Sequence, residues 1–130
     1  MLRLSNVYGA GQSSATFLGS VLRDLATTGK TVIGESADSA KDYICVDDVV
    51  TLAERIARSG GQRIYNVASG RPVSHGAIAQ AAADAGYSCT FRPGGARRRF
   101  PAINITRITD EFAFAPRRLL DDLPALLRTA

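Results

Sequence analysis

The sequence predicts an α/β fold, a small mixed sheet with helices packed on it. Residues 43–46 form an aromatic and β-branched run of strand type. Directly after this run, Val49, Leu52 and Ile56 recur at the spacing of one helical face. A change from strand period to helix period within about one residue is typical of an α/β layer.

Length and composition indicate a single globular domain over residues 1–130. A chain of 130 residues buries roughly two-thirds of its unfolded surface when it folds, which is enough for one domain with a modest core. Two independent domains are not expected. Its 45% hydrophobic and 22% charged residues are ordinary for a globular protein. No apolar run approaches the ~20 residues of a membrane span, and the N-terminus lacks the layout of a signal peptide. We therefore expect a cytoplasmic protein with no membrane partner.

The first third of the chain predicts two strands around one helix. Residues 2–7 form the first strand and run into a glycine-rich turn at 9–11. Ser13 or Ser14 is expected to cap the helix that carries the apolar residues of 17–25, and Gly29 to end it. A short strand follows at 31–33, and the small and polar residues of 34–40 predict a loop or a hairpin connection into the next strand.

The central strand, residues 43–46, leads into a helix that we expect Asp47 to cap and Gly60 to stop. Asp47 and Asp48 could be mistaken for a paired acid and base. Adjacent positions on a helix do not face each other, so a cap and a first-turn carboxylate explain them better.

The last half of the chain alternates strands and helices. Strands are predicted at 63–68 and 88–91, with a helix between them that Ser74 caps and Gly86 stops. Thr106 or Thr109 is expected to start a short helix. Since proline is tolerated only in a first turn, Pro124 places the start of the last helix near residue 121 or 122.

Cysteine and histidine offer little for chemistry. Cys45 and Cys89 stand far apart in apolar strand contexts, which favours two reduced thiols over a disulfide. His75 is the single histidine, so the chain has few residues that could form a zinc site or a Ser-His-Asp triad. We expect His75 to lie on the surface.

Several stretches together resemble a known family. Residues 3–9 (RLSNVYG), 41–48 (KDYICVDD) and 64–70 (IYNVASG), then 92–95 and 114–116, are similar in order and spacing to the C-terminal half of the NAD-dependent epimerase/dehydratase family. These proteins are extended short-chain dehydrogenases that act on nucleotide sugars. The resemblance implies the C-terminal substrate-binding lobe without its Rossmann cofactor lobe, with residues 1–9 belonging to the cofactor-lobe sheet of a full-length parent.

The cofactor and catalytic motifs of that family are not found in this chain. Gly9 and Gly11 follow a strand, but no third glycine completes a dinucleotide-binding turn. The family's catalytic pair is a tyrosine with a lysine four positions later, whereas Tyr8, Tyr43, Tyr65 and Tyr87 are followed at that distance by Gln12, Asp47, Ser69 and Phe91. We expect the pair upstream of Met1, NAD(P) to be bound only in a full-length parent, and no turnover by this chain alone.

The resemblance implies three substrate-binding residues. Asn6 matches an asparagine that hydrogen-bonds the nucleotide sugar, although a turn residue closing a strand is the alternative. Lys41 stands where the family usually has an arginine near the diphosphate, and it keeps the charge without the bidentate fork. Arg92 matches a second phosphate-contacting arginine, but Gly95 follows where the family often has aspartate. Asn66, Tyr43 and Tyr65 are interpreted as structural.

The basic residues allow a competing function. The net charge is +4, and arginines gather in the last third of the chain, including Arg92, Arg97, Arg98, Arg99, Arg107, Arg117 and Arg118. Such a bias fits an anionic partner, either a phosphate ligand or nucleic acid. A non-catalytic interaction module that meets nucleic acid is the alternative, although no aromatic residues interleave with the arginines. We interpret residues 97–99 as a solvated basic loop. A fragment without function is the third alternative.

The resemblance also implies an oligomer. Without a cofactor lobe, strand edges and apolar surface are left open, and open edges recruit another chain. We therefore expect a homodimer or a swapped assembly.

Overall fold

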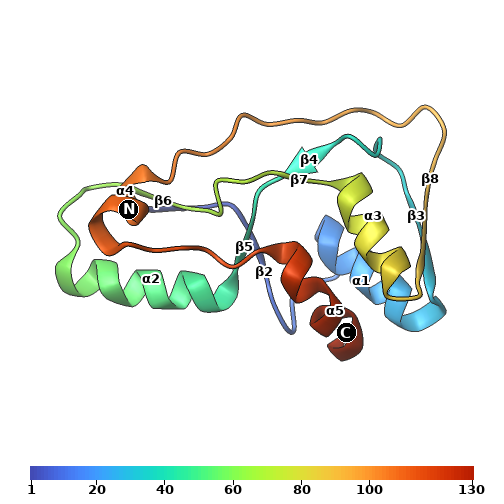
Figure 1. Ribbon diagram of the computed structural model, residues 1–130, viewed down its shortest axis with the longest axis horizontal. Helices are drawn as coiled ribbons and strands as arrows, with labels where there is room; N and C mark the ends of the chain where they lie inside the picture. The colour runs from blue at the N-terminus through green and yellow to red at the C-terminus, as the bar shows by residue number, and fades with distance from the viewer.

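The computed structural model describes residues 1–130, and the molecule is elongated, with a group of helices at each end (Figure 1). Helices α2 and α4 lie at the end that holds the N-terminus, and α1, α3 and α5 lie at the other. The helices are α1 (Phe17–Thr28), α2 (Val46–Ser59), α3 (His75–Asp84), α4 (Thr106–Phe112) and α5 (Leu119–Thr129). The strands are β1 (Leu2–Leu4), β2 (Asn6–Tyr8), β3 (Lys30–Ile33), β4 (Ala40–Lys41), β5 (Tyr43–Cys45), β6 (Tyr65–Val67), β7 (Val73–Ser74) and β8 (Ser88–Phe91).

The strands pair in four two-stranded sheets, which confirms a mixed α/β fold. The pairs β1 with β6, β2 with β5 and β3 with β8 are parallel, and β4 with β7 is antiparallel. The strand predicted over 2–7 is divided at Ser5, because its first half pairs with β6 and its second half with β5. At the division, the Ser5 amide still donates to the Val67 carbonyl oxygen at 3.2 Å.

Strand β5 separates two hydrophobic clusters. Tyr43 and Cys45 point into the cluster formed with α1, α3 and α5, whereas Ile44 points into the one formed with α2, β6 and α4. Successive side chains of a strand face opposite ways, so a three-residue strand serves both clusters. All three residues are buried.

Helix α1 is capped two or three residues later than the sequence predicted. Thr16, not Ser13 or Ser14, occupies the cap position and accepts a hydrogen bond from the Gly19 amide at 3.1 Å. The Ser13 carbonyl oxygen instead accepts from the Thr16 hydroxyl. Gly29 ends the helix at φ 75°, a left-handed conformation that suits glycine, as predicted.

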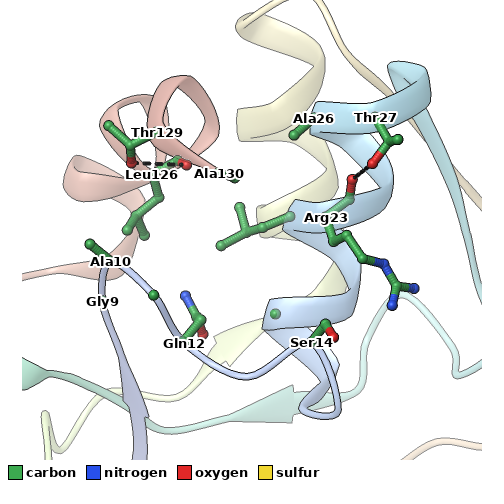
Figure 2. A pocket seen from close by; sticks show the side chains of 13 residues that line it. Gly9, Ala10, Gln12, Ser14, Arg23, Ala26, Thr27, Leu126, Thr129 and Ala130 are labelled. Atoms are coloured by element: carbon green, nitrogen blue, oxygen red, sulfur yellow. Dashed lines mark hydrogen bonds between the residues drawn. The ribbon is translucent and has the colours of Figure 1, made fainter.

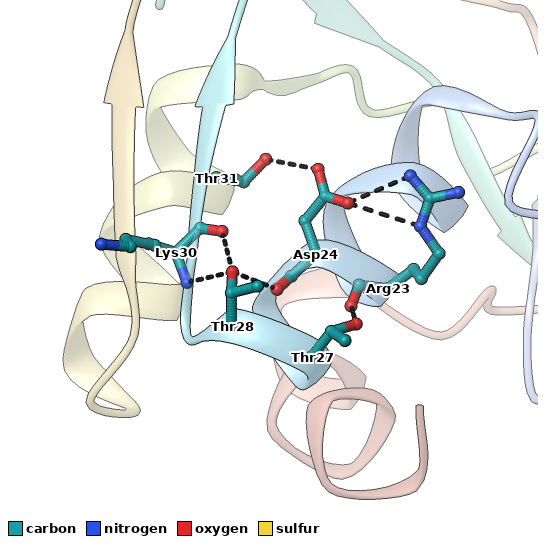
Figure 3. Close-up of polar contacts among 6 residues, drawn as sticks. All are labelled: Arg23, Asp24, Thr27, Thr28, Lys30 and Thr31. Carbon is teal, nitrogen blue, oxygen red and sulfur yellow. Dashed lines mark hydrogen bonds and ion pairs between the residues drawn. The ribbon is translucent and has the colours of Figure 1, made fainter.

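The corner between α1 and β3 is held by side chains (Figure 3). Asp24 accepts from the Arg23 guanidinium at 3.0 Å and from the Thr31 hydroxyl at 3.0 Å. The Thr28 hydroxyl donates to the carbonyl oxygens of Asp24 and Lys30, both at 2.9 Å. These contacts join the last turns of α1 to the first residues of β3.

Two other helix starts differ from the prediction. Helix α2 begins at Val46 with Cys45 in the cap position and no side-chain cap, so the prediction of Asp47 as the cap was wrong. Helix α5 begins at Leu119, which leaves Pro124 inside the helix rather than in its first turn. Ser74 caps α3 as predicted, since its hydroxyl accepts from the Ala77 amide at 3.0 Å.

Strands β4 and β7 were not predicted. They lie at the ends of segments for which the sequence indicates a loop or hairpin connection (34–40) and a loop (69–72), and each has only two residues. Their antiparallel pairing aligns Lys41 with Val73 and Ala40 with Ser74. The pairing places the start of α3 beside the strand that carries Lys41.

Candidate functional site

Asn6 and Lys41 come together around the start of β5. Asn6 is exposed at the start of β2 and is aligned with Tyr43, and its side-chain amide donates to the Asp42 carbonyl oxygen at 2.9 Å. That hydrogen bond uses the nitrogen and leaves the amide oxygen without a protein donor. Lys41 is half-buried at the end of β4, and its ammonium lies 5.0 Å from the centre of the Phe17 ring.

A cavity of about 120 Å³ lies between these two side chains. It is lined by Asn6, Val7, Gln12, Thr16, Phe17, Leu18, Lys41 and Tyr43. This volume is below the roughly 300–1000 Å³ of typical ligand pockets, so the cavity accommodates one end of a larger ligand. The lining combines a cation, an aromatic ring and several hydrogen-bonding groups.

Two polar groups on this cavity lack a protein partner. The Gln12 Nε2 and the Tyr43 hydroxyl are both buried without a hydrogen bond. An unpaired buried polar group costs about 1–3 kcal/mol, which a polar ligand group would offset. Burial, with the nearby Glu35 charge, raises the pKa of the Tyr43 phenol far above its ordinary value. Tyr43 therefore offers a proton donor, not a base.

Asp42 holds the backbone around the cavity, a role that the sequence analysis did not assign. Its carboxylate accepts from the amides of Ser69 and Gly70 at 2.9 Å and 2.8 Å. Gly70 has φ 75°, a conformation that favours glycine in this turn. Asp42 thereby fastens the loop after β6 to the segment that carries Lys41.

Arg92 is not brought to this cavity. It is exposed at the end of β8, where its backbone amide donates to the Ile33 carbonyl oxygen at 2.9 Å. The segment that follows it runs along the molecule from β8 back to α4 (Figure 1). Its role as a phosphate contact stays a prediction.

Residues 97–99 are exposed, as expected for a solvated basic loop, and two of these arginines also form ion pairs. Arg97 contacts Asp38 at 2.9 Å, and Arg98 contacts Glu35 at 2.8 Å. Backbone bonds reinforce these pairs, since the Ser36 amide donates to the Ala96 carbonyl oxygen at 2.9 Å. The basic loop is therefore fastened to the loop between β3 and β4.

The prediction of a surface position for His75 was wrong. The side chain is completely buried, and its ring stacks on Phe17 with ring centres 4.1 Å apart. Its Nε2 lies 3.2 Å from Glu35 Oε1. Burial lowers the pKa of the imidazole below its ordinary value, although the Glu35 carboxylate opposes this shift.

The other residues singled out by sequence have structural roles. Asn66 donates to the Asn104 carbonyl oxygen at 2.9 Å, and the Tyr65 hydroxyl donates to the Glu111 carboxylate at 2.8 Å. Asp48 is buried and accepts from the Arg117 amide at 2.8 Å, while Asp47 is exposed. Both cysteines are free, as predicted.

Larger cavities lie elsewhere. One of about 490 Å³ opens between the 9–12 turn, α1 and the end of α5, with Gln12 and Arg23 among its lining residues (Figure 2). Another, of about 570 Å³, lies between the loop after β6 and residues 114–121 and includes Arg71, Arg117 and Arg118. Neither contains Asn6, Lys41 or Arg92.

The glycine turn at residues 9–11 packs against the start of α2. A side chain at Gly9 would collide with Val46 at 2.5 Å, so this glycine serves the contact with α2. Residues 12–16 separate the glycine turn from α1, whereas a dinucleotide cradle needs the turn to open directly into the helix. No three histidine, cysteine, aspartate or glutamate side chains are grouped so that they could hold a metal ion. No helix has the length and apolar character that a membrane span requires.

Solved structures of nucleotide-sugar enzymes share this fold. The dTDP-glucose 4,6-dehydratase of Bacillus anthracis in complex with NAD has 18% identity and a TM-score of 0.80, with 98% of this chain and 42% of that one covered. The UDP-glucose 4-epimerase of Thermotoga maritima with UDP-glucose has 22% identity and a TM-score of 0.80, with 98% and 44% covered. MoeE5 in complex with UDP-glucuronic acid and NAD has 25% identity and a TM-score of 0.73, again with 98% and 44% covered.

The chain thus has the fold of one part of the sugar epimerases and dehydratases, and it spans less than half the length of these three proteins. The sequence model of the NAD dependent epimerase/dehydratase family matches residues 1–68. The chain belongs to this family. A comparison with curated proteins gave no match.

Proposed function

We propose that this chain is the nucleotide-sugar-binding part of an NAD(P)-dependent sugar epimerase or dehydratase, with Asn6, Lys41 and Arg92 as substrate contacts. One observation carries the proposal: Asn6 and Lys41 share a cavity on which two buried polar groups lack partners. A nucleotide sugar carries hydroxyls and a diphosphate, which match a cation and a set of hydrogen-bonding groups.

The contacts divide between the two ends of such a ligand. The Lys41 ammonium offers a positive charge for the diphosphate, and the Asn6 amide oxygen can accept from a sugar hydroxyl. The Tyr43 hydroxyl and Gln12 Nε2 are then donors to the ligand's oxygens. Because the cavity holds only about 120 Å³, the remainder of the ligand extends toward solvent, and we place Arg92 beside it.

The proposal includes an absence of turnover by this chain alone. No tyrosine has a lysine four positions later, and the glycine turn is not a cofactor cradle, so NAD(P) is assigned to the rest of a longer parent. Within that parent we assign residues 1–9 to the cofactor-lobe sheet. The pairing of Arg97 and Arg98 with carboxylates weighs against a nucleic-acid surface, since it offsets the charge available to phosphates.

We further propose that the isolated chain forms a homo-oligomer. Each sheet has only two strands, which leaves edges unpaired, and apolar side chains are exposed on β1 and α2.

Calorimetric titration of the chain with UDP-glucose, dTDP-glucose and NAD tests the proposal. We expect one of the sugar nucleotides to bind and NAD not to bind. Lys41→Ala should weaken binding roughly tenfold or more, because it removes a charge-assisted contact. Lys30→Ala is the matched control, an exposed lysine at the start of β3 that lines no part of this cavity. Equal affinities of the two variants would overturn the assignment of Lys41.

A further inference from the structure

His75 stands directly behind the wall of the candidate site. It is the first residue of α3 and is completely buried, and its ring is stacked on Phe17 with an interplanar angle of 25°. Phe17 in turn lines the cavity and lies under the Lys41 ammonium. The Phe17 ring is therefore shared between a cavity lysine and a buried histidine.

The hydrogen bond to Glu35 identifies the form of the imidazole. A carboxylate only accepts, so Nε2 carries the proton that faces Glu35 Oε1 at 3.2 Å. Nδ1 is buried without a partner. In the neutral ring Nδ1 is an acceptor, whereas protonation would create a buried N–H with no acceptor, which is unfavourable.

The charged groups around His75 act in opposite directions. The Glu35 carboxylate from the loop after β3 favours a proton on His75, and Lys41 from β4 disfavours it. Arg98 holds the other Glu35 oxygen at 2.8 Å, which weakens the pull of Glu35 on the imidazole. Burial is the largest cause and lowers the pKa of the imidazole, and Lys41 adds to it, so the ring is neutral near pH 7.

We propose that His75 is a positioning residue of the nucleotide-sugar site, whose neutral ring supports Phe17 so that Lys41 is held over the aromatic face. This inference rests on the proposed function. Protonation of His75 would place a second cation against the ring that attracts the Lys41 ammonium. Ligand affinity should then fall as the pH is lowered and His75 takes up a proton. The diphosphate and the sugar do not titrate between about pH 8 and pH 5, so the ligand itself would not cause this fall.

Two substitutions separate ring support from proton uptake. His75→Phe keeps an aromatic ring against Phe17 and removes the titration, so affinity for UDP-glucose should be within about twofold of the parent near pH 7 and flat with pH. His75→Ala removes the support and should weaken binding by about two- to tenfold, the equivalent of one aromatic pair. Leu52→Ala is the control, a completely buried residue of the other cluster that should lower the melting temperature and leave the pH profile unchanged.

A second measurement needs no ligand. In NMR spectra recorded from about pH 8 to about pH 5, the Phe17 ring and Lys41 side-chain signals of the free chain should shift with the same midpoint as the His75 imidazole. In His75→Phe these shifts should disappear. Nuclear Overhauser contacts between the Lys41 side chain and the Phe17 ring should weaken over the same pH range, whereas a merely structural histidine would leave these contacts unchanged even where its charge shifts the Lys41 signals.

The two readouts distinguish the ways in which the inference can fail. Coupled NMR shifts and weakened Overhauser contacts without binding of any sugar nucleotide would support the positioning of Lys41 and overturn the proposed function. Binding of UDP-glucose with the same pH profile in the parent and in His75→Phe would overturn the positioning role and leave the proposed function intact. Uncoupled NMR shifts or unchanged Overhauser contacts would overturn the positioning role in either case.

Discussion

Ala113 carries a left-handed backbone conformation, with φ 50° and ψ 38°, at the end of α4. It is the only residue other than glycine with a positive φ. A side chain makes this conformation unfavourable by roughly 1–2 kcal/mol, and glycine is the usual residue at such a helix end. The position is exposed, so removing the methyl group leaves no cavity.

Ala113→Gly should therefore stabilise the protein by about 1 kcal/mol, measured as the free energy of unfolding in urea. Part of the gain is offset by the greater freedom of glycine in the unfolded chain. Ala125→Gly, at an exposed position inside α5, is the control and should destabilise by about 1 kcal/mol. Equal losses in both variants would show that the conformation of Ala113 imposes no strain.

Asp24 gives a prediction of pH dependence at the same scale (Figure 3). Hydrogen bonds from Arg23 and then from Thr31 lower the pKa of its carboxyl below the ordinary 3.8. An acid with a lowered pKa in the folded state stabilises folding above its ordinary value, and the contribution is lost as the pH falls through the lowered one. Arg23→Gln should raise the pKa of Asp24 more than Thr31→Val does, as measured by carboxyl NMR titration. A larger effect of Thr31→Val would reverse the order of the two causes.

Among the elements, the contact between the 34–39 loop and the basic loop depends on a small residue. A side chain at Gly95 would collide with the Gly34 carbonyl oxygen and approach the backbone of Glu35 to 3.0 Å. The same two loops are joined by the Ser39 hydroxyl, which accepts from the Arg98 amide at 2.8 Å. Close backbone approach is thus needed for the loops to pair.

Gly95→Ala should destabilise the protein by about 1–3 kcal/mol, because the inserted methyl group must push two backbones apart. Gly34→Ala is the control, since a side chain there meets nothing within 4 Å and the backbone is not left-handed. Thermal unfolding followed by circular dichroism measures both. A Gly95→Ala protein as stable as the parent would mean that the loops separate at little cost.

The elements that could be predicted from sequence are those that local residues determine. Gly29 marks the end of α1 because its left-handed conformation is a property of one residue, and Ser74 caps α3 through a bond to its own helix. The start of α2 could not be predicted, because Asp48 is held by the Arg117 amide from a distant segment. Helix α5 accepts Pro124 in its interior, where Leu119 and Leu123 pack into the core.

Part of the candidate site follows from local sequence, and part depends on packing between distant elements. Asn6 and Lys41 are brought together because β2 and β4 both adjoin the recognisable strand β5. No sequence signal pointed to Gln12 or His75. The position of Gln12 on the cavity and the burial of His75 both arise from packing between distant elements. The position of Arg92 relative to the cavity depends on a long connection whose path the sequence does not specify.

At the scale of the whole molecule, one short strand, β5, contributes side chains to both hydrophobic clusters. Tyr43 and Ile44 are neighbours in β5 and belong to different clusters. The backbone of β5 pairs only with β2, and side-chain bonds such as the one from the Arg117 amide to Asp48 add further links between α2 and the segment that leads into α5. Such an elongated molecule exposes more surface than a sphere would, and much of that surface is available for association.

The start of α2 and strand β1 carry exposed apolar side chains that suit association. Val46 and Val50 are 39% and 63% exposed and lie four residues apart, on the same face of α2, and Leu4 of β1 is 50% exposed. Open strand edges and exposed apolar side chains both favour pairing with another copy. We expect a homodimer whose interface includes this face of α2.

Val50→Lys should shift sedimentation toward the monomer at micromolar concentration, because a buried interface would then hold an unpaired charge. Val32→Lys is the matched control, since Val32 is 61% exposed on β3 at the other end of the molecule and should leave association unchanged. If Val32→Lys alone produced monomers, the interface would lie at the β3 and β8 pair instead. A parent chain that stays monomeric over a wide range of concentrations would overturn the expectation, and the exposed valines would then need another explanation.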